Sequence, residues 1–188
     1  MSDQSTGSAV YSTAARKFHW ITTAFVFTLM PVGIYMTNRA AATDFDAFTN
    51  TLYSNHKLGG FILLWLVVAR LAYRLIKGAP ADAPSLNGLQ KFVAHLTHWS
   101  MYGLLLTVPM LGWIGVSLYP ALGIPGGFSL PALASPNEAA AKTAFFLHKI
   151  CGIALAGLIV MHIGAALFHH IVVKDNVLRR MLPKLAAR

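Results

Sequence analysis

Four long apolar stretches, separated by short polar segments, dominate the chain. They run from about residue 18 to 37, 58 to 76, 92 to 119 and 144 to 173. Each has the roughly 20 residues that an α-helix needs to cross the hydrocarbon core of a bilayer. Because backbone groups in lipid find no water to bond, helices are the only structure that suits these stretches. The pattern therefore predicts an all-α integral membrane bundle of four transmembrane helices.

The composition agrees with a membrane domain. Hydrophobic residues make up 56% of the 188 residues and charged residues 11%, and the mean hydropathy is +0.58. These values are too apolar for a soluble domain of this length. We expect residues 1–188 to form a single membrane domain, with tails at 1–16 and 174–188. The one cysteine, Cys151, excludes a disulfide framework and a C-x-x-C-H site for covalent haem attachment.

The formal net charge of +9 lies between and beyond the apolar stretches. This distribution is typical of membrane topology, and it argues against a nucleic-acid-binding surface. Eleven of the fifteen basic residues fall on one side of the predicted helices: Arg16, Lys17, Arg70, Arg74, Lys77, Lys91, Lys174, Arg179, Arg180, Lys184 and Arg188. The positive-inside rule makes this side, and both termini, cytoplasmic. The alternative for the first apolar stretch is a secretory signal cleaved near Ala40–Ala42, but the stretch is longer than a usual signal core.

Eight histidines lie in or at the ends of the predicted helices: His19, His56, His95, His98, His148, His162, His169 and His170. Ionisable residues within a membrane commonly mark functional sites. His148 and His162 are fourteen residues apart on the fourth helix, so they share a face within about 40° and lie ~21 Å apart. One helix then presents imidazoles at two depths, an arrangement that suits two stacked b-type haems.

The second ligand of each haem comes from the helices opposite. His56 begins the second helix on the outer side, level with His148, and His19 on the inner side is left for His162. Ligation by two histidines suits electron transfer, because it keeps small ligands off the iron. His169 is an alternative inner ligand, although it stretches the spacing on the fourth helix to ~31 Å. Histidines that merely bond one another or backbone carbonyls are the competing interpretation.

Further polar residues lie near the expected haems. His95 and His98 share a face at the inner end of the third helix, and with His169 they can form a polar pocket for a quinone headgroup. Interfacial contact with lipid headgroups is the alternative for these histidines.

Four basic residues are candidates for contacts with the haem propionates. Arg70 and Arg74 lie one helical turn apart on the inner side, where they can pair with propionates or reach lipid phosphate. Lys57 and Lys149 each follow an outer ligand, and they can bind propionates or attract an anionic electron donor.

Five short segments, in this order and spacing, resemble the bacterial cytochrome b561 family from about residue 11 to 183. They are Lys17-Phe18-His19-Trp20, Asn55-His56-Lys57-Leu58-Gly59, Ala94-His95-Leu96-Thr97-His98, Leu147-His148-Lys149, and Phe168-His169-His170 followed by Lys174-Asp175-Asn176. The resemblance implies a multi-pass protein of the bacterial inner membrane with two non-covalent b haems, bound by His19 with His162 and by His56 with His148. It also implies a superoxide oxidase, an oxidoreductase that takes electrons from superoxide at the periplasmic side and reduces ubiquinone.

Two other functions are compatible with the residues. The cytochrome b subunits of membrane hydrogenases and formate dehydrogenases share the fourteen-residue ligand spacing and reduce quinone, but they dock to an iron–sulfur partner. The tails of about seventeen and fifteen residues favour an enzyme that requires no protein partner. A haem-free helical transporter with a histidine proton relay is the alternative of another class, and it would be colourless when purified.

Overall fold

The computed structural model describes residues 10–182, and four long helices account for most of them. They are α1 (Thr13–Ala42), α2 (Ala47–Lys77), α3 (Gly88–Leu118) and α4 (Glu138–Phe168), followed by a π-helical turn, η1 (His169–Val173), and a short 3₁₀ turn, η2 (Leu178–Arg180). All four long helices are apolar and long enough to cross a membrane. The predicted all-α architecture of four long apolar helices is therefore confirmed.

Each long helix begins before its apolar stretch, most of all α2, which begins at Ala47 and not near residue 58. The reason is capping. A side-chain oxygen at each start accepts a hydrogen bond from the backbone N–H three residues further on. The capping residues are Ser12, Asp46, Asn87 and Asn137. Each helix thus begins at a polar side chain, and its polar first turns are missed when hydropathy alone sets the ends.

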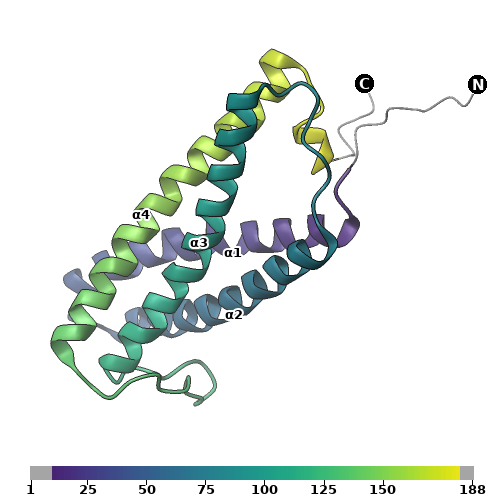
Figure 1. The fold of residues 1–188 in the computed structure, drawn as a ribbon. Helices are drawn as coiled ribbons and strands as arrows, with labels where there is room; N and C mark the ends of the chain where they lie inside the picture. Colours follow the sequence, from purple (N-terminus) through teal and green to yellow (C-terminus); the bar gives the residue numbers. More distant parts are fainter. Residues whose placement is uncertain (1–9, 183–188) are drawn as a thin grey trace, which may run out of the picture.

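The helices form two antiparallel hairpins (Figure 1). α1 packs along α2 and α3 along α4, while α2 also packs against α3 and so joins the hairpins. The two ends of the described chain meet, because the N–H of Tyr11 donates to the carbonyl of Arg180 at 3.2 Å. We call this end of the bundle, which also carries Arg70 and Arg74, the inner end, and the opposite end the outer end.

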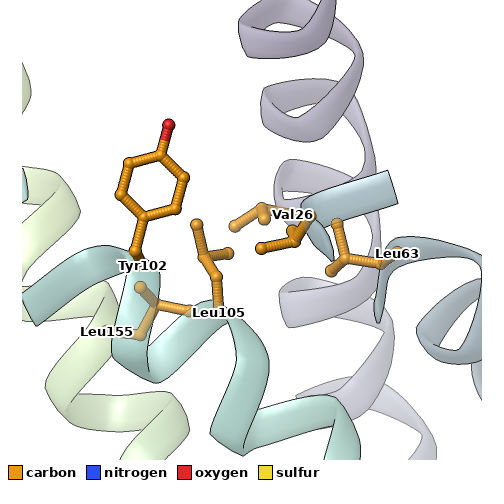
Figure 2. Close-up of a cluster of buried hydrophobic side chains, with 6 residues drawn as sticks. Val26, Leu63, Tyr102, Leu105 and Leu155 are labelled. Carbon is orange, nitrogen blue, oxygen red and sulfur yellow. The ribbon is translucent and has the colours of Figure 1, made fainter. Parts of the chain in front are cut away.

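The apolar core lies midway along the bundle and contains residues from all four helices. Figure 2 shows Val26 of α1, Leu63 of α2, Tyr102 and Leu105 of α3 and Leu155 of α4. Leu155 is 3% exposed, and it lies seven residues from both His148 and His162. The core therefore fills the level between the two α4 histidines.

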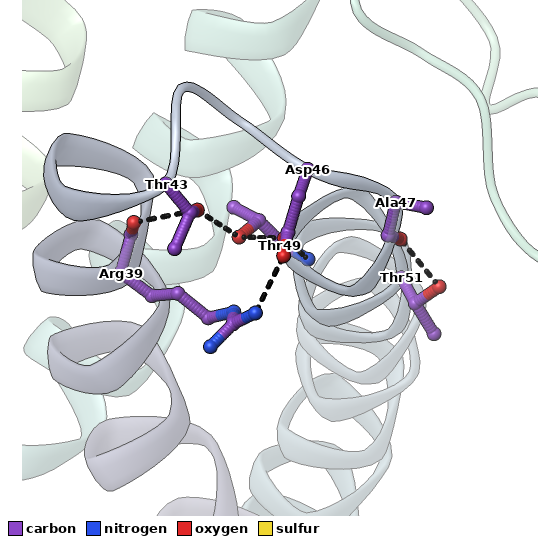
Figure 3. Close-up of polar contacts among 6 residues, drawn as sticks. All are labelled: Arg39, Thr43, Asp46, Ala47, Thr49 and Thr51. Atoms are coloured by element: carbon purple, nitrogen blue, oxygen red, sulfur yellow. Dashed lines mark hydrogen bonds and ion pairs between the residues drawn. The ribbon is translucent and has the colours of Figure 1, made fainter.

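The turn between α1 and α2 is held by polar contacts centred on Asp46 (Figure 3). Its carboxylate accepts hydrogen bonds from the hydroxyl and the N–H of Thr49 at 2.7 and 2.8 Å, and it forms an ion pair with Arg39. The Thr49 hydrogen bonds, and then Arg39, lower the pKa of Asp46 to about 2. The turn thus holds an ionised carboxylate as the N-cap of α2.

The loop between α3 and α4 folds back over the outer end. Trp113 donates its indole N–H to the carbonyl of Pro131 at 2.8 Å, and the N–H of Leu133 donates to Ser117 Oγ at 3.2 Å. Lys57 of α2 reaches across to the carbonyl of Ala121 at 2.9 Å. This loop is therefore fixed to both hairpins, to α3 by Trp113 and Ser117 and to α2 by Lys57.

Candidate haem sites

Two histidines face each other at the outer end, His56 from α2 and His148 from α4. Their ring centroids lie 6.2 Å apart and the ring planes meet at 79°. Nδ1 of His148 lies 2.7 Å from the carbonyl oxygen of Val108. Because a carbonyl only accepts, Nδ1 carries the proton and Nε2 keeps a free lone pair. His148 is therefore held in the tautomer that a metal ligand requires.

Each outer histidine packs against a glycine of the neighbouring helix. A Cβ atom added to Gly33 of α1 would lie 3.1 Å from Cε1 of His56, and one added to Gly112 of α3 would lie 3.2 Å from Cε1 and Nδ1 of His148. These distances are shorter than ordinary van der Waals contact, so a side chain at either position would push the imidazole. The two glycines therefore leave room for the rings.

A second pair lies at the inner end, where His19 of α1 faces His162 of α4. Their centroids are 6.4 Å apart and the planes meet at 65°. The Arg70 guanidinium donates to Nδ1 of His19 at 3.1 Å. In this arrangement the proton of His19 sits on Nε2. For Nε2 to bind iron, that proton must move to Nδ1 and Arg70 must turn to another acceptor.

Both pairs have the separation that a haem iron requires. Two iron–nitrogen bonds of about 2 Å, plus about 1 Å from each ring nitrogen to its centroid, add to about 6 Å. The observed values are 6.2 and 6.4 Å. Within residues 10–182, no three His, Cys, Asp or Glu side chains gather into a metal site. Each pair therefore brings two imidazoles to the separation that would suit one bound iron.

The other predicted inner residues lie in different surroundings. His98 packs on His162, with centroids 5.2 Å apart, which is too short for an iron between them. His95 lies beside Asp82, and its side chain is 51% exposed. The structure thus brings His98 to the inner pair and leaves His95 near the surface.

The alternative inner ligand, His169, follows the last residue of α4. Its Nδ1 lies 2.6 Å from Oδ2 of Asp175, and its side chain is 11% exposed. His162 is the α4 histidine that the structure places opposite His19, whereas His169 is held by the segment that follows it.

The basic residues proposed for propionates have other partners here. Arg74 stacks on the rings of Trp99 and Tyr102, and with Arg70 it lines a pocket of about 30 Å³ beside Tyr11 and Tyr73. Lys57 holds the outer loop, and Lys149 lies on the exposed side of α4. Arg70 and Arg74 therefore share a small pocket at the inner end.

The contacts that Gly33, Gly112 and Asp175 make with these histidines were not predicted from the sequence. The two glycines carry no pattern of their own, because their role depends on which helix lies opposite. Asp175 could have been identified as a candidate partner of His169, because it is one of the few acids in the chain and lies six residues after this histidine.

Comparison with known proteins gives a consistent result. Residues 10–184 match the family described as prokaryotic cytochrome b561. The chain is similar to cytochrome b561 homolog 2 of Escherichia coli, with 29% identity over 93% of this chain and 92% of the relative. It is 29% identical to cytochrome b561 homolog 1 of Escherichia coli over 88% of this chain and 93% of the relative. A probable superoxide oxidase, CybB of Yersinia pestis, is 30% identical over 66% of this chain and 71% of its own length.

Proposed function

Because the chain belongs to the prokaryotic cytochrome b561 family, and so transfers electrons in the inner membrane with b-type haem, we propose that it binds two such haems. His56 and His148 hold the outer one, and His19 and His162 hold the inner one. The observation that carries this proposal is the separation within each pair, 6.2 and 6.4 Å. A bound haem supplies reversible one-electron chemistry at each level.

The residues around each pair have supporting roles. Val108 keeps His148 in the ligating tautomer, and Gly112 makes room for the ring. At the inner pair, Arg70 would turn from His19 to a propionate of a bound haem, which is a stronger acceptor than a neutral ring nitrogen. Arg74 lines the same pocket and adds a second positive charge. The chain thus provides an oriented ligand and space at the outer pair, and positive charge at the inner pair.

The orientation follows from the basic residues. The inner end carries both described chain ends and Arg70, Arg74 and Lys77, and the positive-inside rule places such an end in the cytoplasm. The outer pair then lies toward the periplasm. Electrons that enter at the periplasmic side pass along α4 from the level of His148 to that of His162.

The terminal substrates that fit best are superoxide outside and ubiquinone inside. A relative is named as a probable superoxide oxidase, and superoxide is an anion that Lys57 and Lys149 can attract to the outer end. At the inner end, His98 lies against His162, and His169 and His95 offer further groups that exchange protons with a quinone. The proposed activity is therefore that of a superoxide:ubiquinone oxidoreductase.

Haem content tests the proposal directly. A dithionite-reduced minus oxidised spectrum of the detergent-purified protein, with a pyridine haemochrome assay, should give two b haems per chain. A value of one would contradict one of the two pairs, and a colourless protein would contradict both.

The substrates need a separate measurement. Superoxide generated beside the oxidised protein should reduce the haems, and superoxide dismutase should block this reduction. Addition of a short-tail ubiquinone should then reoxidise them. Haems that stay oxidised under a superoxide flux would rule out superoxide as the donor.

A further inference from the structure

The chain turns sharply where α4 ends. The π-helical turn η1 runs over His169–Val173, and Lys174 follows in the left-handed region with φ 57°. The N–H of Asp175 then donates to the carbonyl of His169 at 3.1 Å. Turns of the π type inside or at the end of α-helices are frequent at functional sites. This one returns the chain so that the carboxylate of Asp175 reaches the imidazole of His169.

The Asp175 carboxylate is almost enclosed and fully hydrogen-bonded. Oδ2 lies 2.6 Å from Nδ1 of His169 and accepts from the hydroxyl of Ser85 at 2.7 Å, while Oδ1 accepts from the N–H of Val177 at 3.0 Å. Burial acts to raise the pKa of Asp175, but the hydrogen bonds from Ser85, Val177 and His169 outweigh it and lower the pKa. Asp175 is therefore a carboxylate that accepts three hydrogen bonds.

The carboxylate fixes the tautomer of His169. Because Oδ2 only accepts, Nδ1 of His169 carries a proton, and Nε2 is the atom left to exchange a proton with a ligand. A carboxylate behind an imidazole also stabilises its protonated form and holds the ring in one orientation. The pair thus has the arrangement of an oriented acid–base group.

The position of the pair suits the inner redox site. His169 lies seven residues after His162, which is about 10 Å along the helix. Ser85 is exposed in the loop between α2 and α3, whereas the side chains of Asp175 and His169 are 10% and 11% exposed. A chain of hydrogen bonds therefore connects solvent, through Ser85 and Asp175, to the enclosed imidazole of His169. The side chains of His95 and Asp82 are 51% and 39% exposed, so water reaches that pair directly.

From these contacts we infer that Asp175 is a positioning residue for quinone reduction, holding His169 so that Nε2 delivers a proton to a quinone oxygen. The inference rests on the proposed function and names the proton donor of that site. Reduction of a quinone to the quinol takes two electrons, which arrive one at a time through the haems, and two protons. One proton leaves Nε2 of His169 and is replaced from cytoplasmic water, and the second comes from water.

The test compares two electron acceptors with the full-length, haem-loaded protein. Ferricyanide takes one electron and no proton, whereas a short-tail ubiquinone takes both. In Asp175→Asn, whose single amide oxygen can keep the hydrogen bond from Val177 while its NH2 group replaces Oδ2 beside Ser85 and His169, reoxidation of dithionite-reduced haems by the quinone should slow about tenfold or more. Reoxidation by ferricyanide and the haem content should not change. Equal slowing with both acceptors, or slowing with neither, would overturn the inference.

Two further variants distinguish a positioning role of Asp175 from a general effect of substitution on folding. Asp175→Glu keeps the carboxylate and should recover part of the quinone rate. Glu138→Gln removes a carboxylate from an exposed ion pair with Lys142 at the outer start of α4, and it should match the wild type with both acceptors. A glutamate variant as slow as the asparagine variant, together with a slow Glu138→Gln, would show that the assay reports general damage and not the pair.

A spectroscopic measurement does not depend on turnover. In protein labelled with ¹⁵N-histidine, the signal assigned to His169 should show a protonated Nδ1 in the wild type and lose this pattern in Asp175→Asn. A wild-type His169 protonated on Nε2 alone would overturn the inference even if the protein reduces quinone. If the spectrum is as expected but the wild-type haems do not react with quinone, the proposed function fails instead and the pair has no part in quinone reduction.

Discussion

The imidazole of His148 donates its Nδ1 proton to the carbonyl oxygen of Val108, 2.7 Å away on α3. α3 and α4 form one hairpin, so the proposed ligand is oriented by its own hairpin partner, while its counterpart His56 comes from the other hairpin. The outer haem would thus be held between a ring that is locked in place and a ring on a separate unit. Substitutions in the α3–α4 hairpin and in the α1–α2 hairpin can therefore test the two proposed ligands, His148 and His56, separately.

The first prediction concerns the space that Gly112 leaves for His148. Gly112→Val should displace the ring and lower the haem content from two toward one per chain, because the added Cβ would lie 3.2 Å from Cε1 and Nδ1. Gly103→Val is the matched control, since a Cβ at Gly103 meets nothing within 4 Å. Pyridine haemochrome assays of both proteins give the answer, and equal loss in both would contradict the role of Gly112.

The second prediction concerns the ligands themselves. His56→Ala and His148→Ala should each remove the outer haem alone, and His162→Ala should remove the inner haem alone, because each haem depends on its own pair. His170→Ala, which changes a histidine outside both pairs, should keep two haems. The measurement is haem per chain with redox titration of the one that remains. Variants that all retain two haems would refute the assignment.

The third prediction separates ligation from proton exchange at the inner end. His98→Ala and His169→Ala should keep both haems and slow quinone reduction about tenfold or more. Stopped-flow reoxidation by quinone, followed at the haem band, measures the rate. Loss of a haem in His169→Ala would instead identify His169 as the inner ligand and leave His162 without that role.

The fourth prediction concerns acidity at the α1–α2 turn. The pKa of Asp46 is lowered from 3.8 to about 2 in the folded protein, so its charge stabilises the fold above about pH 4, and this contribution is lost as the pH falls through about 2. Asp46→Asn keeps the shape without the charge. The melting temperature should therefore differ between wild type and variant near pH 6, and the difference should shrink toward pH 2.

Thermal unfolding in detergent, followed by circular dichroism, tests this pH dependence. Thr51→Ala is a suitable control, because the Thr51 hydroxyl bonds only the carbonyl of Ala47 in the same turn (Figure 3). Its effect should not depend on pH. A melting difference for Asp46→Asn that stays constant from pH 6 to pH 3 would contradict the role of the charge.

The sequence predicts well the features that depend on a long apolar stretch or on a fixed spacing between residues. Apolar length was enough for the four helices, and the fourteen residues between His148 and His162 were enough to place two imidazoles on one side of α4. His56 and His19 were expected opposite them from the ends of the apolar stretches, and the structure places these histidines nine residues after the start of α2 and six after the start of α1. The polar first turns outside the apolar stretches were not predicted, because Asp46 and Asn137 cap these turns through local hydrogen bonds that hydropathy averages do not register.

Contacts between distant segments could not be predicted. The ammonium group of Lys57 donates to the carbonyl of Ala121, in a loop sixty-four residues away, and no sequence pattern predicts this partner. Asp175 reaches His169 only because η1 and the left-handed Lys174 reverse the chain. Turn geometry and loop position do not follow from hydrophobic periodicity. These two contacts could therefore be identified only from the three-dimensional structure.

The apolar core at Leu155 has an electrical consequence. It forms a layer of low dielectric between the two histidine levels, so an electron that moves from His148 to His162 moves charge through part of the membrane voltage. With the basic end in the cytoplasm, as proposed, the electron travels toward the negative side. Full transit would cost about 2.3 kcal/mol per 100 mV. An energised membrane should therefore slow this protein, and dissipating the voltage in proteoliposomes should speed it.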